Sequence, residues 1–436
     1  MNVQASLQPL EIGSLWQKTA PPAPANPSLV ENTTADVTII GAGFTGLRAA
    51  LYLAEAGSRV VVLDAGDVAY GASGRTGGQV NPMLPFNTPK QLQGLLGDTY
   101  FERLTETALG SADELFDLIK TYQIECQARQ NGWLRVMHND RALTQATEGV
   151  NAWNAHGAGM EILGREDIFK LSGSRAYASG VVTPKGGAVQ PMSLAQGVAD
   201  AARQRGVKIH GRSAVTDLEQ AGDKWIATTD GGRVTSDWVV VATNGYTDSL
   251  IPGLAKSVLP LTPIQMATDP LPEDVIGSVL PGGHTISDSR RVIMYARREP
   301  DNRMVYGGFG KVAKDGTATG FDWLIKDANR VFPQLKGVDW TSRWWGRVAL
   351  TDDHLPHLHE PKKGLLVGMG YNGRGVAMSH VMGRVLAERV LGAAPETLAF
   401  PTSPVRAFPY RSVTMAGMGT AVWFMRFLDF IESKGR

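Results

Sequence analysis

The clearest pattern of apolar and polar positions lies between residues 36 and 65. DVTII, at 36–40, is a short apolar run that predicts a buried strand. GAGFTGLRAALYLAEAG follows at 41–57, with one apolar helical face and a glycine where the helix should end. RVVVLDA, at 59–65, predicts a second buried strand. Together these form a βαβ unit, whose crossover predicts a parallel sheet.

Strands and helices alternate in the remaining chain. Residues 98–170 have mainly helical spacing, and a further helix is predicted from Pro191 to Gly206. The other predicted strands are 207–209, 214–218, two or more within 224–243 with a hairpin turn at 230–232, 291–298, 303–310 and 364–370. Two more helices are predicted at 321–332 and 376–390.

Composition narrows the class of protein. The 436 residues carry 43 basic and 42 acidic side chains, a net charge of +1, which argues against a protein built to bind nucleic acid. The single cysteine, Cys126, excludes an intrachain disulfide and a cysteine-cluster metal site. His354, His357 and His359 surround Pro356 in a pattern typical of a loop, so no metal is predicted.

The two ends of the chain differ from its body. Residues 1–35 are proline-rich and predict an extended arm, and no basic residue precedes Lys18, so a secretory signal is not expected. The charge-free stretch between Arg411 and Arg426 is shorter than the roughly 20 residues of a membrane-spanning helix. It predicts either a packed helical tail or a weak interfacial membrane contact. The expected location is cytoplasmic, free or peripheral to the inner membrane.

A dinucleotide-binding fingerprint occupies the predicted βαβ unit. Gly41, Gly43 and Gly46 form GxGxxG directly after a strand and at the start of a helix. This arrangement permits a tight turn, a close approach of pyrophosphate and close packing of helix on strand. Asp64 ends the second strand, where it can accept hydrogen bonds from a ribose diol. The fingerprint predicts nucleotide binding but does not separate NAD from FAD.

Two later glycine-rich segments favour a flavin. GASGRTGGQV, at 71–80, has Ser73 and Arg75 to hold phosphate oxygens, and glycines that let the backbone lie against a flat ring. GMGYNGRGVAMSHVMGRVL, at 368–386, is a second strand-to-helix turn, which directs the positive end of a helix toward the pyrimidine edge of a flavin.

These motifs resemble those of one family. In order, ADVTIIGAGFTGLRAALYLAEAG, GASGRTGGQ, VVVATNGYTDSLIPGL, RWWGRVALTDDHLPHL and GYNGRGVAMSHVMGRVLAERVLG are similar to the D-amino-acid oxidase superfamily of FAD oxidoreductases, in particular its gamma-glutamylputrescine oxidase branch. The resemblance implies an α/β fold of the glutathione-reductase type, with a discontinuous Rossmann-like FAD domain and an inserted mixed-sheet α+β substrate domain.

The resemblance also implies a domain plan and a set of cofactor contacts. The FAD domain would comprise 36–95, 186–255 and 346–395, the substrate domain 96–185 and 256–345, and a helical tail 396–436. FAD would be bound non-covalently, because no cysteine occurs near RVALTDD, where some relatives attach it. The implied cofactor residues are Gly41, Gly43, Phe44, Thr45, Gly46, Asp64, Ala65, Ser73, Gly74, Arg75, Gly77, Gly78, Gln79, Ala214, Val215, Ala242, Gly370, Asn372, Gly373, Arg374 and Gly375.

The implied chemistry is oxidation of a C–N bond in a primary or secondary amine or an amino acid. A flavin acts as the hydride acceptor, and the protein supplies position and electrostatics. Four residues are candidates for positioning the substrate: Tyr295, Arg297, Trp345 and Tyr371. Arg297 is expected to pair with a carboxylate or else to be a solvated edge-strand residue.

Several alternatives remain open on the sequence alone. The electrons could pass to oxygen, giving peroxide, or to a quinone, which the apolar tail would favour. The chain could instead be a non-catalytic flavoprotein subunit or an NAD-dependent dehydrogenase. The substrate and the oligomeric state are not predicted.

Overall fold

A six-stranded sheet lies at the centre of one half of the molecule. The computed structural model describes residues 13–313 and 315–434. The strand order is β23 (His357–Lys362), β24 (Leu365–Met369), β13 (Trp238–Val241), β2 (Val37–Ile40), β3 (Val60–Leu63) and β9 (Lys208–His210). Strands β24 to β9 are parallel, and β23 is antiparallel to β24. The predicted βαβ unit and its parallel sheet are therefore confirmed.

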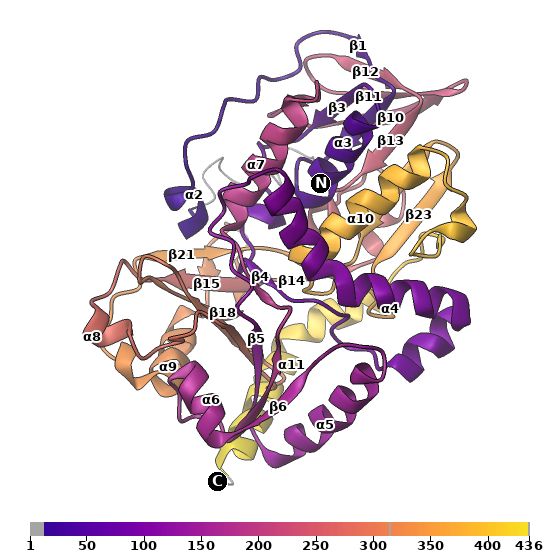
Figure 1. Cartoon of the computed structure of the whole chain (residues 1–436). Coiled ribbons are helices and arrows are strands. Elements are labelled where there is room, and N and C mark those ends of the chain that lie inside the picture. The colour runs from indigo at the N-terminus through magenta and orange to yellow at the C-terminus, as the bar shows by residue number, and fades with distance from the viewer. Residues whose placement is uncertain (1–12, 314, 435–436) are drawn as a thin grey trace.

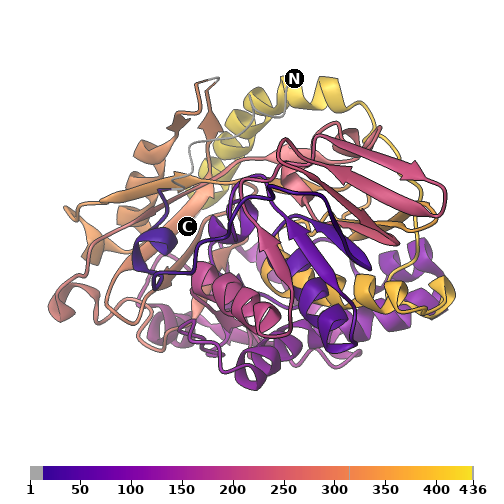
Figure 2. The same cartoon turned by 90° about the horizontal axis from the view of Figure 1, so that it is seen from above.

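Both faces of this sheet are buried, which explains the continuous apolar runs in its strands. Helices α3 (Phe44–Glu55), α7 (Pro191–Arg203) and α10 (Gly375–Val390) belong to one side, where Ile39 and Val62 join their core. Ile40 and Leu63 point to the other side. That side carries a small sheet of β1 (Thr33–Thr34), β12 (Arg233–Ser236), β11 (Lys224–Thr228) and β10 (Asp217–Ala221). Figures 1 and 2 show the helices and this small sheet on opposite sides.

A second, eight-stranded mixed sheet forms the other half (Figure 1). Its order is β21 (Ser342–Trp345), β15 (Pro263–Ala267), β18 (Met304–Phe309), β17 (Tyr295–Arg298), β16 (Thr285–Asp288), β5 (Trp133–Met137), β7 (Ser179–Thr183) and β6 (Glu161–Gly164). One face is apolar: Leu134, Met266 and Ile286 pack there. Residues of α6 (Arg165–Ser172), α8 (Glu273–Ile276) and α9 (Phe321–Val331) complete that core.

The opposite face of this sheet carries polar and aromatic side chains. Residues paired across neighbouring strands project to the same face, so the register identifies which residues share it. One row crosses the sheet through Val181, Arg135, Ser287, Tyr295, Gly307, Gln265 and Trp344. We call this row the front row. Hydrogen bonds from Gln265 and Trp344 to Arg75 O turn it toward the predicted cofactor segments.

The sequence prediction fails at several elements. His357 and His359, expected in a loop, lie on strand β23. The stretch 98–170 contains α4 (Pro89–Thr121) and α5 (Asp140–Asn154), but also strands β5 and β6. Strand β5 pairs with β16 and β7, and its pairing with β16 joins residues about 150 positions apart, so local spacing does not reveal it. Strand β10 begins at Asp217 rather than 214, and β17 begins at Tyr295 rather than 291.

The N-terminal arm contains a short helix that the sequence did not predict. Helix α2 (Leu15–Thr19) is capped by Ser14, whose hydroxyl accepts from the Gln17 N–H. Residues 1–12 of the predicted arm lie outside the described residues. The remaining short pairs are β4 (Gln79–Val80) with β8 (Gly187–Ala188), β14 (Leu259–Leu261) with β22 (Val348–Leu350), and β19 (Lys311–Val312) with β20 (Ala318–Thr319).

The C-terminal helix α11 (Arg411–Lys434) lies along the second sheet (Figures 1 and 2). Arg426 donates to Phe309 O at 3.1 Å and Arg291 pairs with Asp429 at 3.0 Å, so one side of the helix is docked. Of the described helices, none has the length and apolar character required to cross a membrane. The domain boundaries given above stay a prediction.

Candidate active site

The turn between β2 and α3 is closely packed, and its glycines are required by that packing. A Cβ on Gly46 would lie 1.9 Å from Gly41 O, and one on Gly43 would lie 2.9 Å from Ser73 Oγ. Helix α3 can therefore begin directly against the turn only without these side chains. The N-terminus of the helix is left at the surface of the turn, where backbone N–H groups and the helix dipole favour phosphate.

The segment 71–80 lies against this turn. The Ser73 hydroxyl accepts a hydrogen bond from the N–H of Phe44 at 3.0 Å, and the N–H of Ala69 donates to Ala42 O at 3.0 Å. A one-turn helix, η1 (Ala72–Gly74), places Ser73 there. The first two predicted cofactor segments are thus adjacent, although about 30 residues separate them in sequence.

The carbonyl groups of residues 74–78 are held by side chains that are distant in sequence. Ser14 Oγ donates to Gly74 O at 3.1 Å, and Trp16 Nε1 donates to Thr76 O at 2.7 Å. Arg75 O accepts from Gln265 Nε2 at 2.5 Å and from Trp344 Nε1 at 3.1 Å. The Arg297 guanidinium donates to Gly77 O at 3.2 Å and to Gly78 O at 2.7 Å. The N-terminal helix and the second sheet therefore fix the conformation of this segment together.

The third glycine turn, at 370–375, meets the first. Tyr371 OH lies 2.5 Å from Thr45 Oγ1, so a direct hydrogen bond joins the two turns. Asn372 stabilises the turn: its amide donates to Gly370 O at 2.6 Å, and its Oδ1 accepts from the Thr351 N–H at 2.9 Å. Helix α10 begins at the end of this turn, so its N-terminus lies close to that of α3.

The end of β13 joins the first and third turns. The N–H of Ala242 donates to Ile40 O at 2.8 Å, and Asn244 Oδ1 accepts from the N–H of Gly370 at 2.9 Å. All three glycine-rich segments and the 242–246 turn therefore converge at the carboxyl ends of the parallel strands, where open α/β sheets bind ligands.

Asp64 is placed at the end of β3 beside the first turn. Its carboxylate accepts from the N–H groups of Ala42 at 2.7 Å and Gly66 at 2.8 Å. The N–H of Ser213 donates to Asp64 O at 2.7 Å. Three further residues predicted to contact the cofactor are adjacent in sequence to this hydrogen bond: Ala65 follows Asp64, and Ala214 and Val215 follow Ser213.

Burial raises the pKa of Asp64 to about 6. If its carboxylate accepts ribose hydroxyl donors, protonation removes an acceptor, so FAD binding should weaken as the pH falls through that value. We expect the dissociation constant of FAD for the apoprotein to rise about 10-fold or more between about pH 8 and about pH 5. Fluorescence titration of FAD checks this. Asp64→Asn should bind weakly with little pH dependence in that range, and an unchanged pH profile in this variant would contradict the assignment.

The prediction that Arg297 binds a substrate carboxylate needs correction. Its side chain is 1% exposed, and all three of its nitrogens are engaged within the protein. The guanidinium forms a bidentate ion pair with Glu299, and one nitrogen also donates to Val189 O at 2.7 Å. It is also not a solvated edge residue. We assign Arg297 as a positioning residue for the 77–78 backbone.

The geometry does not support a substrate role for Trp345 either. Trp345 pairs with Ile264 and joins the apolar core behind the sheet, and its Nε1 donates to Gly316 O at 3.2 Å. Its neighbour Trp344 faces the cofactor segments instead. Because neighbouring strand residues alternate between faces, only one of the two tryptophans can lie there.

The other two substrate candidates, Tyr295 and Tyr371, lie at the predicted cofactor segments. Tyr295 contacts the cofactor segment, since a Cβ on Gly77 would lie 3.0 Å from its ring. Burial raises the pKa of Tyr295, so its hydroxyl is neutral at neutral pH. Tyr371 links the turns through Thr45 rather than pointing to the front row. Gln79 joins the cofactor segment to the second sheet by donating to Ala296 O at 3.0 Å.

Sequence reasoning missed four residues of this region: Ser14, Trp16, Gln265 and Arg135. The sequence offers Trp344 and Trp345 together, one as a wall of the pocket or else as a buried core side chain, and the structure turns Trp344 toward the cofactor segments. Ser14 and Trp16 were missed because the arm was predicted to be extended. The other two lie on strands, and the signal was available for β15, where alternation places Gln265 between buried Ile264 and Met266. Arg135 was missed with its strand.

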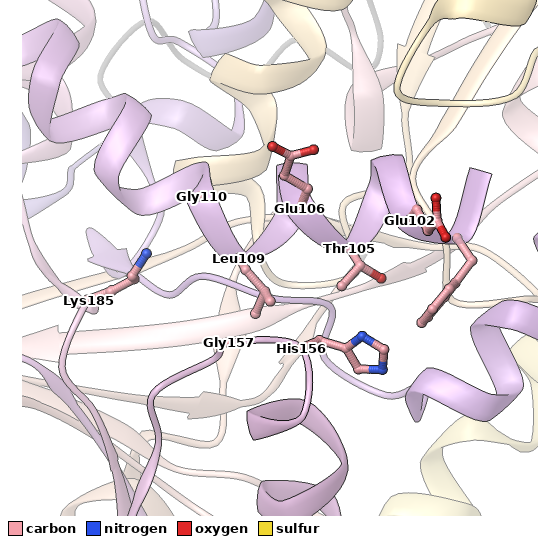
Figure 3. Close-up of a pocket in the computed structure, with 9 residues that line it drawn as sticks. Glu102, Thr105, Glu106, Leu109, Gly110, His156, Gly157 and Lys185 are labelled. Carbon is pink, nitrogen blue, oxygen red and sulfur yellow. The ribbon is translucent and has the colours of Figure 1, made fainter. Parts of the chain in front are cut away.

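One hollow of the described residues lies elsewhere, against α4. Its volume is about 490 Å³, and Figure 3 shows it between α4 and the turn at His156, with the Glu106 carboxylate pointing away from that histidine. None of the predicted cofactor residues lines it. A second cavity of about 420 Å³ does reach them, through Arg374.

Comparison with known proteins decides the family. Residues 36–389 match the family model described as DAO, FAD dependent oxidoreductase. The chain belongs to this family. It is 34% identical over 414 residues to gamma-glutamylputrescine oxidoreductase of Escherichia coli K12, covering 92% of this chain and 94% of that protein. It is 23% identical over 366 residues to glycine oxidase of Geobacillus kaustophilus, covering 81% and 92%.

Solved structures agree on the fold. The crystal structure of that glycine oxidase superposes with a TM-score of 0.70 at 21% identity, covering 86% of this chain and 99% of the other. L-proline dehydrogenase from P. horikoshii gives 0.69 at 19% identity, covering 88% and 99%. The D-amino-acid oxidase type of fold is therefore confirmed. The protein is an enzyme, an FAD-dependent oxidoreductase acting on amines or amino acids, and it binds FAD non-covalently.

The residues present fit FAD. Gly46 lets α3 begin tightly against the turn, and at Gly43 a side chain would meet Ser73 Oγ at 2.9 Å, so the backbone N–H groups of the turn are not covered by side chains of these two residues. Within the described chain, Arg75 and Tyr246 each have a buried polar atom, Nη2 and the hydroxyl, that lacks a hydrogen-bond partner beside the converging turns. Buried polar groups without partners are uncommon, and a bound ligand would satisfy them. Residue-by-residue cofactor contacts stay a prediction.

Trp16 provides a test of how the arm supports this site. Trp16→Phe removes the hydrogen bond to Thr76 O but keeps a ring against Arg297, which lies 4.8 Å from the Trp16 ring. We expect the free energy of unfolding to fall by about 1–3 kcal/mol and FAD to bind more weakly, because the Thr76 carbonyl loses its donor. Denaturant unfolding and FAD titration measure both. Unchanged FAD affinity would show that the arm does not support the cofactor segment.

Proposed function

We propose that this enzyme oxidises the C–N bond of a gamma-glutamylputrescine-like amine or an N-substituted amino acid, with oxygen as the electron acceptor. The overall reaction converts amine, O2 and water into a carbonyl compound, ammonia or a smaller amine, and H2O2. The E. coli relative, by its name, acts on gamma-glutamylputrescine. The observation that carries the proposal is the front row, whose polar side chains face the 74–78 segment.

The chain's own residues would position the reactants. Bound FAD supplies a hydride acceptor, so the carbon beside the amine loses a hydride and the imine that remains is hydrolysed by water. Tyr295, neutral and placed against Gly77, is the residue we assign to orient the amine nitrogen. The N-terminus of α10, at Gly375, would stabilise negative charge on the cofactor side of the site. An amine that enters unprotonated requires no strong base.

A peroxide-release screen tests the proposal. Purified protein is assayed with polyamine conjugates, secondary amino acids, sarcosine-like amines and D-amino acids. Release of H2O2 with a polyamine conjugate or a secondary amino acid is expected, together with anaerobic bleaching of the flavin colour and its return when air is admitted. Bleaching without return in air would contradict oxygen as the acceptor.

A quinone acceptor is the second candidate, and one observation favours it. Helix α11 exposes an apolar side on which Trp423 is 68% exposed and stacks on Phe427, with ring centroids 6.0 Å apart. Such a surface could lie in a membrane interface and bring the enzyme to a quinone pool. Recolouring of bleached enzyme by a soluble quinone but not by air would support this reading.

A further inference from the structure

The cavity of about 420 Å³ joins the surface to the predicted cofactor site. Its walls come from the segment 82–88, from β5 and β7, and from α5. Trp133, which also lines the cavity, is fixed by donating from Nε1 to Ser287 Oγ at 2.9 Å, and Ser287 neighbours Tyr295 in the front row. Arg374, which directly precedes α10, also lines the cavity. The cavity therefore reaches one predicted cofactor residue, Arg374, and Trp133, whose hydrogen-bond partner Ser287 lies beside Tyr295.

Arg135 projects into this cavity from the middle of the sheet. It is the one exposed residue of β5, whose other four residues are buried, and β5 is covered on both edges by β16 and β7. Within the described chain, the side chain of Arg135 forms no hydrogen bond or ion pair, although its backbone pairs with β16 and β7. The acid nearest in register, Asp288, pairs with Val136 and is bound to Arg290 on the apolar face of the sheet. Arg135 thus has no counter-ion on its own side.

Arg374 also lacks an ion-pair partner among the described residues. Its guanidinium carbon lies 4.8 Å from the centre of the Trp133 ring, and its Nε is buried without a partner among the described residues. Burial and the positive charge of Arg135 lower the pKa of Arg374 to about 10, which indicates that the two arginines are close enough to repel. Two unpaired arginines in one cavity form a site for an anion.

The other charges of the cavity do not neutralise this pair. Arg291 and Glu432 also line it, but they bind each other at 2.8 Å, and Arg291 pairs with Asp429 as well. The rest of the wall is mixed. Met83, Leu84, Val150, Trp153 and Val181 form its apolar part, whereas Asn139, Gln145, Thr183 and Ser289 are polar, and Arg141 and His138 add no negative charge. A chain of methylene groups would contact the apolar part, and a carboxylate would reach the arginines.

We propose that Arg135, together with Arg374, binds a carboxylate that the substrate carries at the end of an aliphatic chain. This inference rests on the proposed function, because it assigns the specificity of the same site. It identifies the substrate as a carboxylate-bearing aliphatic amine, and Arg135 as the residue that distinguishes it from a simple diamine. Since Arg135 has no ion-pair partner in the described chain, replacing it leaves no carboxylate unpaired.

The test compares binding and turnover in Arg135→Gln holoenzyme. Glutarate, a dicarboxylate without an amine, is titrated while the visible flavin spectrum is followed. We expect Arg135→Gln to weaken glutarate binding about 10–100-fold, with Arg135→Lys intermediate. With gamma-glutamylputrescine, KM should rise by a similar factor while kcat changes little. Activity toward N-acetylputrescine, which has no carboxylate, should be low in the wild type and unchanged in the variant.

The control variant is Arg165→Gln. It makes the same charge change at an exposed site on α6, outside the cavity, and should leave glutarate binding unaltered. Wild-type glutarate affinity in Arg135→Gln, or no glutarate binding by the wild type, would overturn the inference. If the wild type binds glutarate through Arg135 but oxidises no amine, the proposed function fails while the carboxylate site stands.

Discussion

Arg297→Met is expected to lower the free energy of unfolding by about 3–5 kcal/mol and to give a protein that no longer retains FAD. The substitution leaves Glu299 buried without its bidentate partner, with only Arg129 at 3.3 Å. It also removes the donor of Gly77 O and Gly78 O. The cofactor segment should therefore lose its fixed conformation. Denaturant unfolding and the FAD content of the purified protein measure the two effects.

A second variant separates the charge effect from the positioning effect. Arg297→Met with Glu299→Gln removes the unpaired buried carboxylate, so part of the lost stability should return. FAD retention should stay low, because the two carbonyls still lack their donor. Arg165→Met, at an exposed arginine, serves as the control and should change neither quantity. If the double variant retains FAD as the wild type does, Arg297 does not position the cofactor segment.

Gly46→Ala should strongly weaken FAD binding, with a smaller loss of stability than Arg297→Met causes. The added Cβ would lie 1.9 Å from Gly41 O and 3.1 Å from Ile39 Cγ2, so α3 must move away from the turn. Such overpacking costs about 1–3 kcal/mol. The displaced turn would also lose the N–H geometry that binds phosphate, and we expect the FAD dissociation constant to rise about 100-fold or more.

Gly94→Ala is the matched control, because it adds the same methyl group to a glycine of α4 with no atom within 4 Å. It should leave FAD binding unchanged and raise stability by up to about 1 kcal/mol. A Gly46→Ala protein that purifies yellow, with wild-type FAD content, would contradict the role assigned to this turn.

The parts of the fold that sequence predicted are those held together locally. Strands β2 and β3 are buried on both faces, so they appear as unbroken apolar runs, and the glycines between them mark the turn. The D-amino-acid oxidase resemblance added the overall plan. Strand β5 carries an arginine in its middle and depends on β16, which lies far away in sequence, so no local signal identifies it.

The site was predicted as far as backbone segments determine it. The three glycine-rich turns converge because each follows a strand of the same parallel sheet. Side-chain roles were harder, because they depend on distant partners: Arg297 was assigned to substrate, whereas Glu299, two residues on, is its partner. The pair could have been suspected from that spacing, since residues two apart share one face of a strand. No comparable pattern in the sequence indicated that Trp16 would hold the cofactor segment through Thr76 O.

The proposed catalysis requires FAD to lie where the three turns meet, with its ring facing the front row. A crystal structure of the yellow holoenzyme measures this directly. We predict one FAD, with pyrophosphate at Gly43, its ring against residues 75–78 and the N-terminus of α10, and the cavity of Arg135 opening onto that ring. A ring bound away from Gly77, or separated from the Arg135 cavity by protein, would contradict this prediction.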